Sequence, residues 1–86
     1  MTTTATKTLK RPTKTELRKA SDNSREVFSS WVKNSRVKAK LSQEALAEYA
    51  GVDRKTINRI ENGHFSPSLD TMTRLSVVLR TNIPRI

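Results

Sequence analysis

With 86 residues and no cysteine, the chain has room for one domain and carries neither a disulfide framework nor a thiolate metal site. One histidine excludes a site built from several imidazoles, and no apolar stretch approaches the roughly 20 residues that span a membrane. The formal net charge of +9 favours a polyanionic partner, above all nucleic acid.

The N-terminal quarter of the chain differs in composition from the rest. Residues 1–12 are rich in threonine, lysine and arginine and show no hydrophobic period, which is typical of a disordered segment. We therefore predict a basic, disordered arm over residues 1–22 and one folded domain over residues 23–86. The arm either keeps the protein soluble or follows the backbone or minor groove of a nucleic acid.

The arm contains one helix signal. Thr13 and Glu16 have the spacing of a capping box, in which each side chain bonds to the backbone N–H of the other residue. This spacing allows a short helix over residues 13–20. The Ser-Asp-Asn-Ser run that follows, residues 21–24, is typical of a turn and is expected to end that helix.

The domain begins with two predicted helices. Apolar residues recur at helical spacing from about Ser24 to Lys40, which predicts the first helix. Ser42 is a good N-cap for a second helix over residues 43–50. Gly51 then breaks this helix.

Two further helices are expected. The third runs from Arg54 to about Asn62, with Asp53 as its N-cap and Gly63 as its left-handed stop. The fourth begins after Ser68 and carries apolar residues at helical spacing as far as position 79. No alternating strand pattern is present, so the sequence predicts an all-α fold.

Residues 43–60 match the geometry of two short helices that cross at a steep angle. Ala47 is the small residue where the two backbones approach, and Gly51 tolerates positive φ at the bend. Five apolar residues supply the plug between the helices: Leu46, Ala50, Val52, Ile57 and Ile60.

This pattern resembles the helix-turn-helix of the Cro and phage-repressor type, also called XRE-like. The resemblance spans about Val32 to Leu79 and is carried by LSQEALAEYAGV, RIENG and the Pro-Ser-Leu start of the next helix. It implies a compact four- to five-helix bundle of the lambda-repressor-like type. It also implies a bacterial or phage-encoded cytoplasmic protein that places a recognition helix, residues 54–61, in the major groove of double-stranded DNA.

With Ile57 and Ile60 facing inward, polar side chains of the recognition helix project from its opposite side. A solvated charged face is the ordinary interpretation of such a pattern, but within this motif a contact with bases or phosphates is favoured. The predicted base-reading residues are Arg54, Lys55, Arg59, Asn58 and Thr56. Because arginine and lysine donate to O6 and N7 of guanine, we expect a half-site that contains guanine.

The resemblance assigns roles to residues around this helix. Ser42 and Gln43 at the start of the second helix, and Asn62 after the recognition helix, are predicted phosphate contacts. In the family this glutamine also braces the first recognition residue. Plain polar roles at helix ends are the alternatives for Gln43 and Asn62. Arg36 and Glu61 match the positions of a largely buried ion pair in the family, so we predict a structural role for both.

The chain departs from the family at two places. Glycine often ends the first and fourth helices, where this chain has Lys40 and Arg80. A fifth helix that helps the domain pair with itself usually follows, but residues 81–86 have room for no more than one turn. We therefore expect a homodimer, if one forms, to use the N-terminal extension.

Several aromatic residues keep two interpretations. Trp31, near Val27 in the first helix, either packs in the core or contacts a second protomer or another protein. Tyr49 and Phe65 are open between surface packing and partner contact. His64 is expected to be an ordinary loop residue.

Three functions remain open at this point. The first is a transcriptional regulator that binds as a pair to a two-fold operator. The second is an antitoxin that binds a toxin through Trp31 and the N-terminal extension, and the third is a protein-binding adaptor with a degenerate motif. An enzyme is not expected, because the sequence has no nucleophile–base pair, metal cluster or phosphate loop. No cofactor is expected either.

Overall fold

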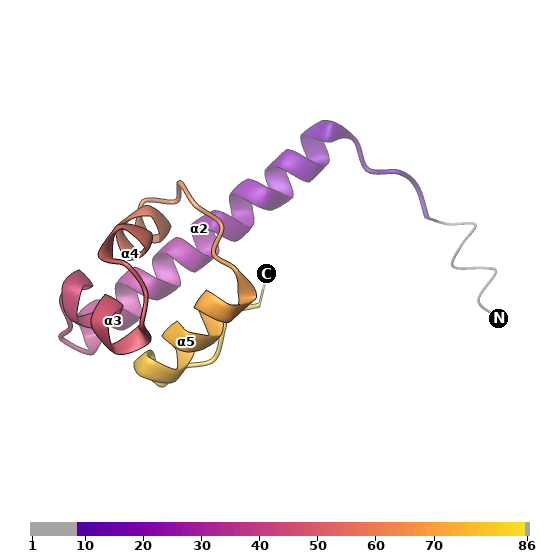
Figure 1. The fold of residues 1–86 in the computed structure, drawn as a ribbon. Helices are drawn as coiled ribbons and strands as arrows, with labels where there is room; N and C mark the ends of the chain where they lie inside the picture. The colour runs from indigo at the N-terminus through magenta and orange to yellow at the C-terminus, as the bar shows by residue number, and fades with distance from the viewer. Residues whose placement is uncertain (1–8, 86) are drawn as a thin grey trace.

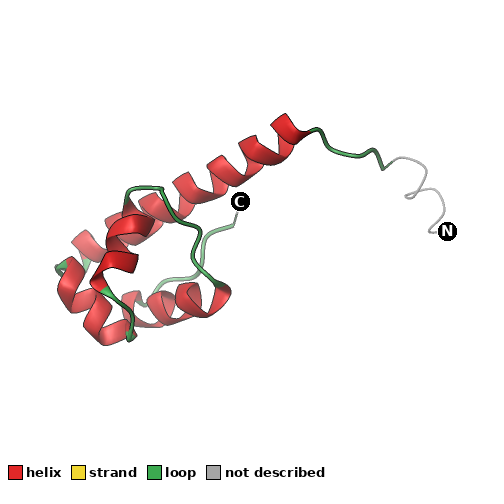
Figure 2. Cartoon of the chain, turned by 45° about the horizontal axis from the view of Figure 1, so that its top comes forward, coloured by secondary structure: helices red, strands yellow, loops and turns green. Residues whose placement is uncertain are grey.

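A computed structural model describes residues 9–85, and within that range the chain is helical, with no strand (Figure 2). The helices are α2, Lys14–Lys38; α3, Gln43–Ala50; α4, Arg54–Glu61; and α5, Leu69–Leu79. The three short helices gather around the C-terminal half of α2 (Figure 1). The predicted all-α, lambda-repressor-like fold is confirmed.

The first helix is longer than the sequence predicted. It starts at the predicted capping box, in which Thr13 Oγ1 accepts from Glu16 N at 3.0 Å and Glu16 Oε1 accepts from Thr13 N at 2.8 Å. The helix then continues for 25 residues, so the turn predicted over residues 21–24 is wrong. It also crosses the predicted domain boundary between residues 22 and 23, while residues 1–8 of the predicted arm lie outside the described residues.

The polar side chains that suggested a turn bond within the helix instead. Ser24 Oγ donates to the Ala20 carbonyl at 3.0 Å, one helical turn back. Arg25 and Asp22 form an ion pair at the i, i+3 spacing of a helix. These contacts are compatible with a helix because they join residues on the same side of it.

The core takes side chains from every helix. Val32 of α2, Leu46 of α3, Ile57 and Ile60 of α4 and Leu75 of α5 have no exposed surface. Burying a side chain of this size stabilises the fold by about 1.5–3 kcal/mol. The core therefore holds α4 by its inward face and leaves its outer face free.

The N-terminal part of α2 has no such cover. All residues from 14 to 23 are exposed, and this part of the helix projects away from the other three (Figure 1). Leu17 in this segment keeps 57% of its surface exposed. No helix within residues 9–85 is both long and apolar enough to cross a membrane.

Candidate nucleic-acid interface

The bend between α3 and α4 is made by backbone geometry. Gly51 has φ of +70°, and the next N–H, of Val52, donates to the Ala47 carbonyl at 3.0 Å. This is the Schellman arrangement, which turns the chain sharply after α3. A Cβ at Gly51 would lie 3.0 Å from Nη1 of Arg74, so the bend is also closely packed.

The two helices start differently. Ser42 Oγ accepts from Ala45 N at 3.0 Å and caps α3 as predicted. Asp53 occupies the N-cap position of α4, but its side chain makes no capping hydrogen bond. Instead its backbone carbonyl accepts from Thr56 N at 3.0 Å. The capping role predicted for the Asp53 side chain is therefore wrong.

The outer face of α4 brings four of the five predicted base readers together. They are exposed and line one open depression of about 390 Å³: Arg54, Lys55, Asn58 and Arg59. The fifth, Thr56, is half-buried. None of the ion pairs within residues 9–85 involves a cation of this face, so its positive charge is not neutralised by a carboxylate.

Arg59 is held by an aromatic ring. Its guanidinium carbon lies 5.0 Å from the centroid of Phe65, which itself packs against the core. The loop that carries Phe65 is tied to α4, because His64 N donates to the Arg59 carbonyl at 3.1 Å. A ring of this kind orients a guanidinium through cation–π attraction and leaves its charge intact. The sequence had left Phe65 open, because stacking depends on the path of the loop.

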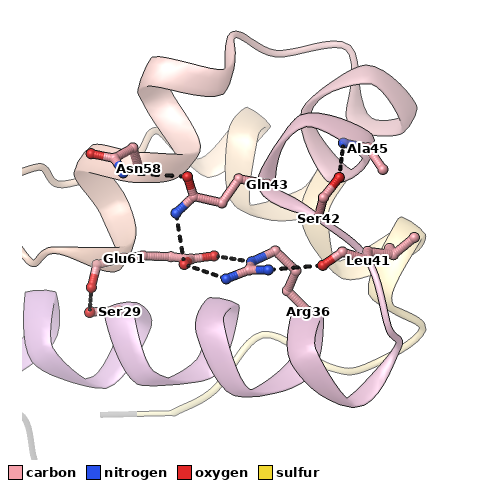
Figure 3. Close-up of polar contacts among 8 residues, drawn as sticks. All are labelled: Ser29, Arg36, Leu41, Ser42, Gln43, Ala45, Asn58 and Glu61. Carbon is pink, nitrogen blue, oxygen red and sulfur yellow. Dashed lines mark hydrogen bonds and ion pairs between the residues drawn. The ribbon is translucent and has the colours of Figure 1, made fainter.

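A buried ion pair lies beneath the interface. Arg36 Nε and Nη2 donate to the Glu61 carboxylate at 2.6 and 3.0 Å, and the two side chains are 15% and 4% exposed (Figure 3). Arg36 Nη1 also donates to the Leu41 carbonyl at 2.8 Å, and Ser29 Oγ donates to the Glu61 carbonyl. The pair thus joins α2 to the end of α4.

The charge of Arg36 is insensitive to ordinary changes of pH. Its hydrogen bond to Glu61 raises the pKa of Arg36 above its already high usual value, against the opposing effect of burial. A raised pKa contributes stability that is lost only when the pH rises through the pKa of the folded state. The guanidinium therefore stays charged throughout the physiological range.

Amide side chains connect this pair to the outer face of α4. Gln43 Nε2 donates to Glu61 Oε1 at 3.1 Å, and Gln43 Oε1 accepts from Asn58 Nδ2 at 3.3 Å (Figure 3). Asn58 Oδ1 in turn accepts from Asn62 Nδ2 at 3.0 Å. Gln43 therefore braces Asn58 and not Arg54, the first residue of α4.

The other two aromatic residues that the sequence left open, Trp31 and Tyr49, do not line this depression. Trp31 is half-buried against the core, in edge-to-face contact with Phe28 at 6.5 Å between ring centroids. Its Nε1 is buried without a hydrogen-bond partner in the described part of the chain. Tyr49 remains 65% exposed.

Two short helices joined at a glycine bend, with a cationic outer face on the second, define the helix-turn-helix class of DNA-binding proteins. A family model described as Helix-turn-helix matches residues 32–86, which is more than half of the chain. The chain therefore belongs to the helix-turn-helix family of the Cro and XRE type, a DNA-binding family. No match is found among curated proteins or among solved structures.

Proposed function

We propose that this protein is a sequence-specific transcriptional regulator that places α4 in the major groove of double-stranded DNA. The observation that supports this most is the outer face of α4, where four polar side chains border one depression opposite the buried Ile57 and Ile60. Cations that lack a carboxylate partner suit phosphates and the acceptor atoms of guanine. Such a regulator would act in the cytoplasm and catalyse no reaction.

Each predicted residue has a role in this proposal. Residues of the outer face would contact base edges: Arg54, Lys55, Asn58 and Arg59, with Thr56 at its margin. Ser42 and Gln43 at the start of α3, together with Asn62 after α4, would position the helix by contacts to phosphates. Two protomers would bind an operator with half-sites about one helical turn apart.

In vitro selection from a random pool of duplex DNA tests the proposal directly. We expect one enriched sequence that contains guanine and has two-fold symmetry. Replacement of Arg59 by alanine should cost about 1–3 kcal/mol and relax the preference at one base pair. Loss of a phosphate contact should instead weaken binding to all DNA sequences alike and lower the salt dependence of the affinity.

Arg18 provides a matched control, because it is an exposed arginine in the N-terminal part of α2, away from the other three helices. Arg18→Ala removes the same charge as Arg59→Ala without touching α4. It should change the affinities for the selected and the random duplex in the same proportion. Equal losses on both duplexes for Arg59→Ala would contradict base reading by α4.

An antitoxin role is a second candidate, favoured by the exposed N-terminal part of α2. A toxin that covers this segment would bury Leu17, which is now 57% exposed. The discriminating experiment purifies the protein with its native partners. A stoichiometric small protein that is toxic alone, neutralised by the wild-type chain and released by Leu17→Asp, would support this role. Neutralisation that Leu17→Asp leaves unchanged would refute the binding site.

A further inference from the structure

We propose that Asn58 reads an adenine, and that the buried Arg36–Glu61 pair sets the orientation of the Asn58 amide through Gln43. The inference rests on the proposed function, in which α4 faces base edges. It adds the identity of one base to that function. It also gives the buried ion pair a part in recognition.

The chain of hydrogen bonds begins at the buried pair of Arg36 and Glu61. Arginine can only donate, and an ionised glutamate can only accept, so the 2.6 and 3.0 Å contacts between Arg36 and Glu61 have one possible direction. The carboxylate then requires a donor from its next neighbour. That neighbour, 3.1 Å away, is the Gln43 side chain, which must present its NH2 group.

This constraint passes from Gln43 to the surface. With its NH2 group turned to Glu61, Gln43 presents its oxygen to α4, and Asn58 must answer with its own NH2 group at 3.3 Å. The oxygen of Asn58 then faces the other way, where it accepts from Asn62 at 3.0 Å. Each amide orientation follows from the one before it, back to a carboxylate that is 4% exposed.

The Asn58 amide still has capacity for a base. A primary amide has two N–H groups and two acceptor lone pairs. Gln43 takes one N–H and Asn62 takes one lone pair, so one of each remains on a side chain that is exposed in the depression. In the major groove adenine offers an acceptor, N7, beside a donor, N6, whereas guanine offers two acceptors. The free groups of Asn58 therefore match adenine.

Fixing the orientation matters because a free amide can rotate by half a turn. Rotation would exchange the positions of its donor and acceptor and place like groups against N7 and N6. The two neighbours of Asn58 oppose this rotation from opposite ends of the amide. Asn58 would therefore meet the base already in the orientation that adenine requires, without an ordering cost at binding.

The first experiment uses the sequence obtained by selection. Each adenine in it is replaced in turn by 7-deazaadenine, which lacks the N7 acceptor and keeps N6. At one position we expect the wild-type affinity to fall by about 2- to 10-fold, the value of one hydrogen bond. The affinity of Asn58→Ala should not change when 7-deazaadenine replaces adenine at that position. The variant should also lose about 5- to 150-fold in discrimination between adenine and the other bases there.

The second experiment tests the chain of hydrogen bonds. Gln43→Met keeps a side chain of similar length and removes both of the Gln43 contacts. It should reduce adenine discrimination at the same position as Asn58→Ala does, although Asn58 is unchanged. Loss of a phosphate contact by Gln43 would lower affinity for all duplexes alike and leave the ratio unchanged. Asn34→Ala, which removes an exposed asparagine of α2, is the matched control.

The readout separates folding from recognition, because a ratio of two affinities measured on one sample does not depend on its folded fraction. If no adenine of the selected sequence shows an N7 effect that depends on Asn58, the inference is overturned and the proposed function stands. Full adenine discrimination in Gln43→Met would refute the orienting role. A wild-type protein that selects no sequence would overturn the proposed function and the inference together.

Discussion

Phe65 shows how a single side chain can hold an arginine without neutralising its charge. A carboxylate partner would orient Arg59 equally well, but it would neutralise the charge and occupy donors that a base or phosphate needs. The ring of Phe65, 5.0 Å from the guanidinium carbon, orients the group through its face. The donors at the edge of the guanidinium therefore remain available.

The contact between these two residues can be measured by a double-mutant cycle. Phe65→Leu should preserve most of the packing against the core and remove the cation–π contact with Arg59. We expect it to weaken binding to the selected duplex by about 0.5–1 kcal/mol in the wild-type background. In the Arg59→Ala background it should have almost no further effect, and Phe65→Tyr should restore binding. Equal losses in both backgrounds would show that Phe65 acts through packing alone.

The sequence predicted which residues share the outer face of α4 but not how they are held. The period of Ile57 and Ile60 is local, so it placed Arg54, Lys55 and Arg59 on one side correctly. The brace on Asn58 comes from Gln43, which lies 15 residues earlier in the chain. Such contacts depend on how two helices cross, and no local pattern reports that.

At the scale of whole elements, the helix ends share one geometry. After each of the four described helices, one residue turns to positive φ and the next N–H bonds back to a carbonyl within the helix, as in the Schellman motif. Two of these residues are Gly51 and Gly63, at φ of 70° and 72°, while Lys40 and Arg80 adopt 59° and 54°. The left-handed region costs a residue with a Cβ about 1–2 kcal/mol.

Glycine at position 40 should therefore stabilise the protein. Lys40→Gly removes the strain of positive φ, partly offset by the greater freedom of glycine in the unfolded chain, so we expect a gain of about 0.5–1 kcal/mol. Lys33→Gly is the control, since Lys33 is an exposed residue in the interior of α2, and it should cost about 1 kcal/mol. Urea denaturation measures both changes. A loss of stability in Lys40→Gly would contradict this account.

The exposed segment of α2 should open independently of the core. Thr13→Ala removes the capping hydrogen bond to Glu16 N, which is worth about 0.5–2 kcal/mol to a helix start. Residues 14–23 are all exposed, so we expect faster amide hydrogen exchange there and an unchanged melting temperature. A lower melting temperature would show that this segment supports the core.

Residues 21–24, where the sequence predicted a turn, lie within α2. Ser, Asp and Asn favour turns because their side chains compete for backbone groups, and residues 21–24 contain only these types. Here Ser24 bonds to the carbonyl one turn back, and Asp22 pairs with Arg25, so both side chains are used without a break. The same composition therefore suits a turn and a helix equally well.

At the scale of the molecule, the Arg36–Glu61 pair connects distant parts of the chain. It joins α2 to α4, and Gln43 brings α3 to the same carboxylate. Because Glu61 is almost fully buried, its removal leaves the Arg36 guanidinium without a carboxylate partner and the Gln43 amide without this acceptor. Small domains have total stabilities of only about 5–15 kcal/mol, so breaking this pair removes a large share of the free energy of unfolding.

Glu61→Ala should therefore destabilise the protein by about 3–5 kcal/mol. Asp70→Ala is the matched control, because it removes a carboxylate from the Arg74 pair, where the Asp70 side chain is 77% exposed. That change should cost no more than about 1 kcal/mol. Thermal and urea denaturation compare the two variants. Similar small losses would mean that the buried pair contributes little beyond an exposed one.

The sequence alone determined the helical fold, the glycine bend and the residues of the outer face of α4, because each of these depends on local periodicity and on the backbone freedom of single residues. The extra length of α2 is also local, since its bonds join residues three or four apart, but the composition of residues 21–24 suits a turn equally well. The tertiary structure decided the ring beneath Arg59 and the hydrogen bonds from Arg36 to Asn58. These contacts join residues of different elements. Their distances and directions exist only once the core has set how the helices cross.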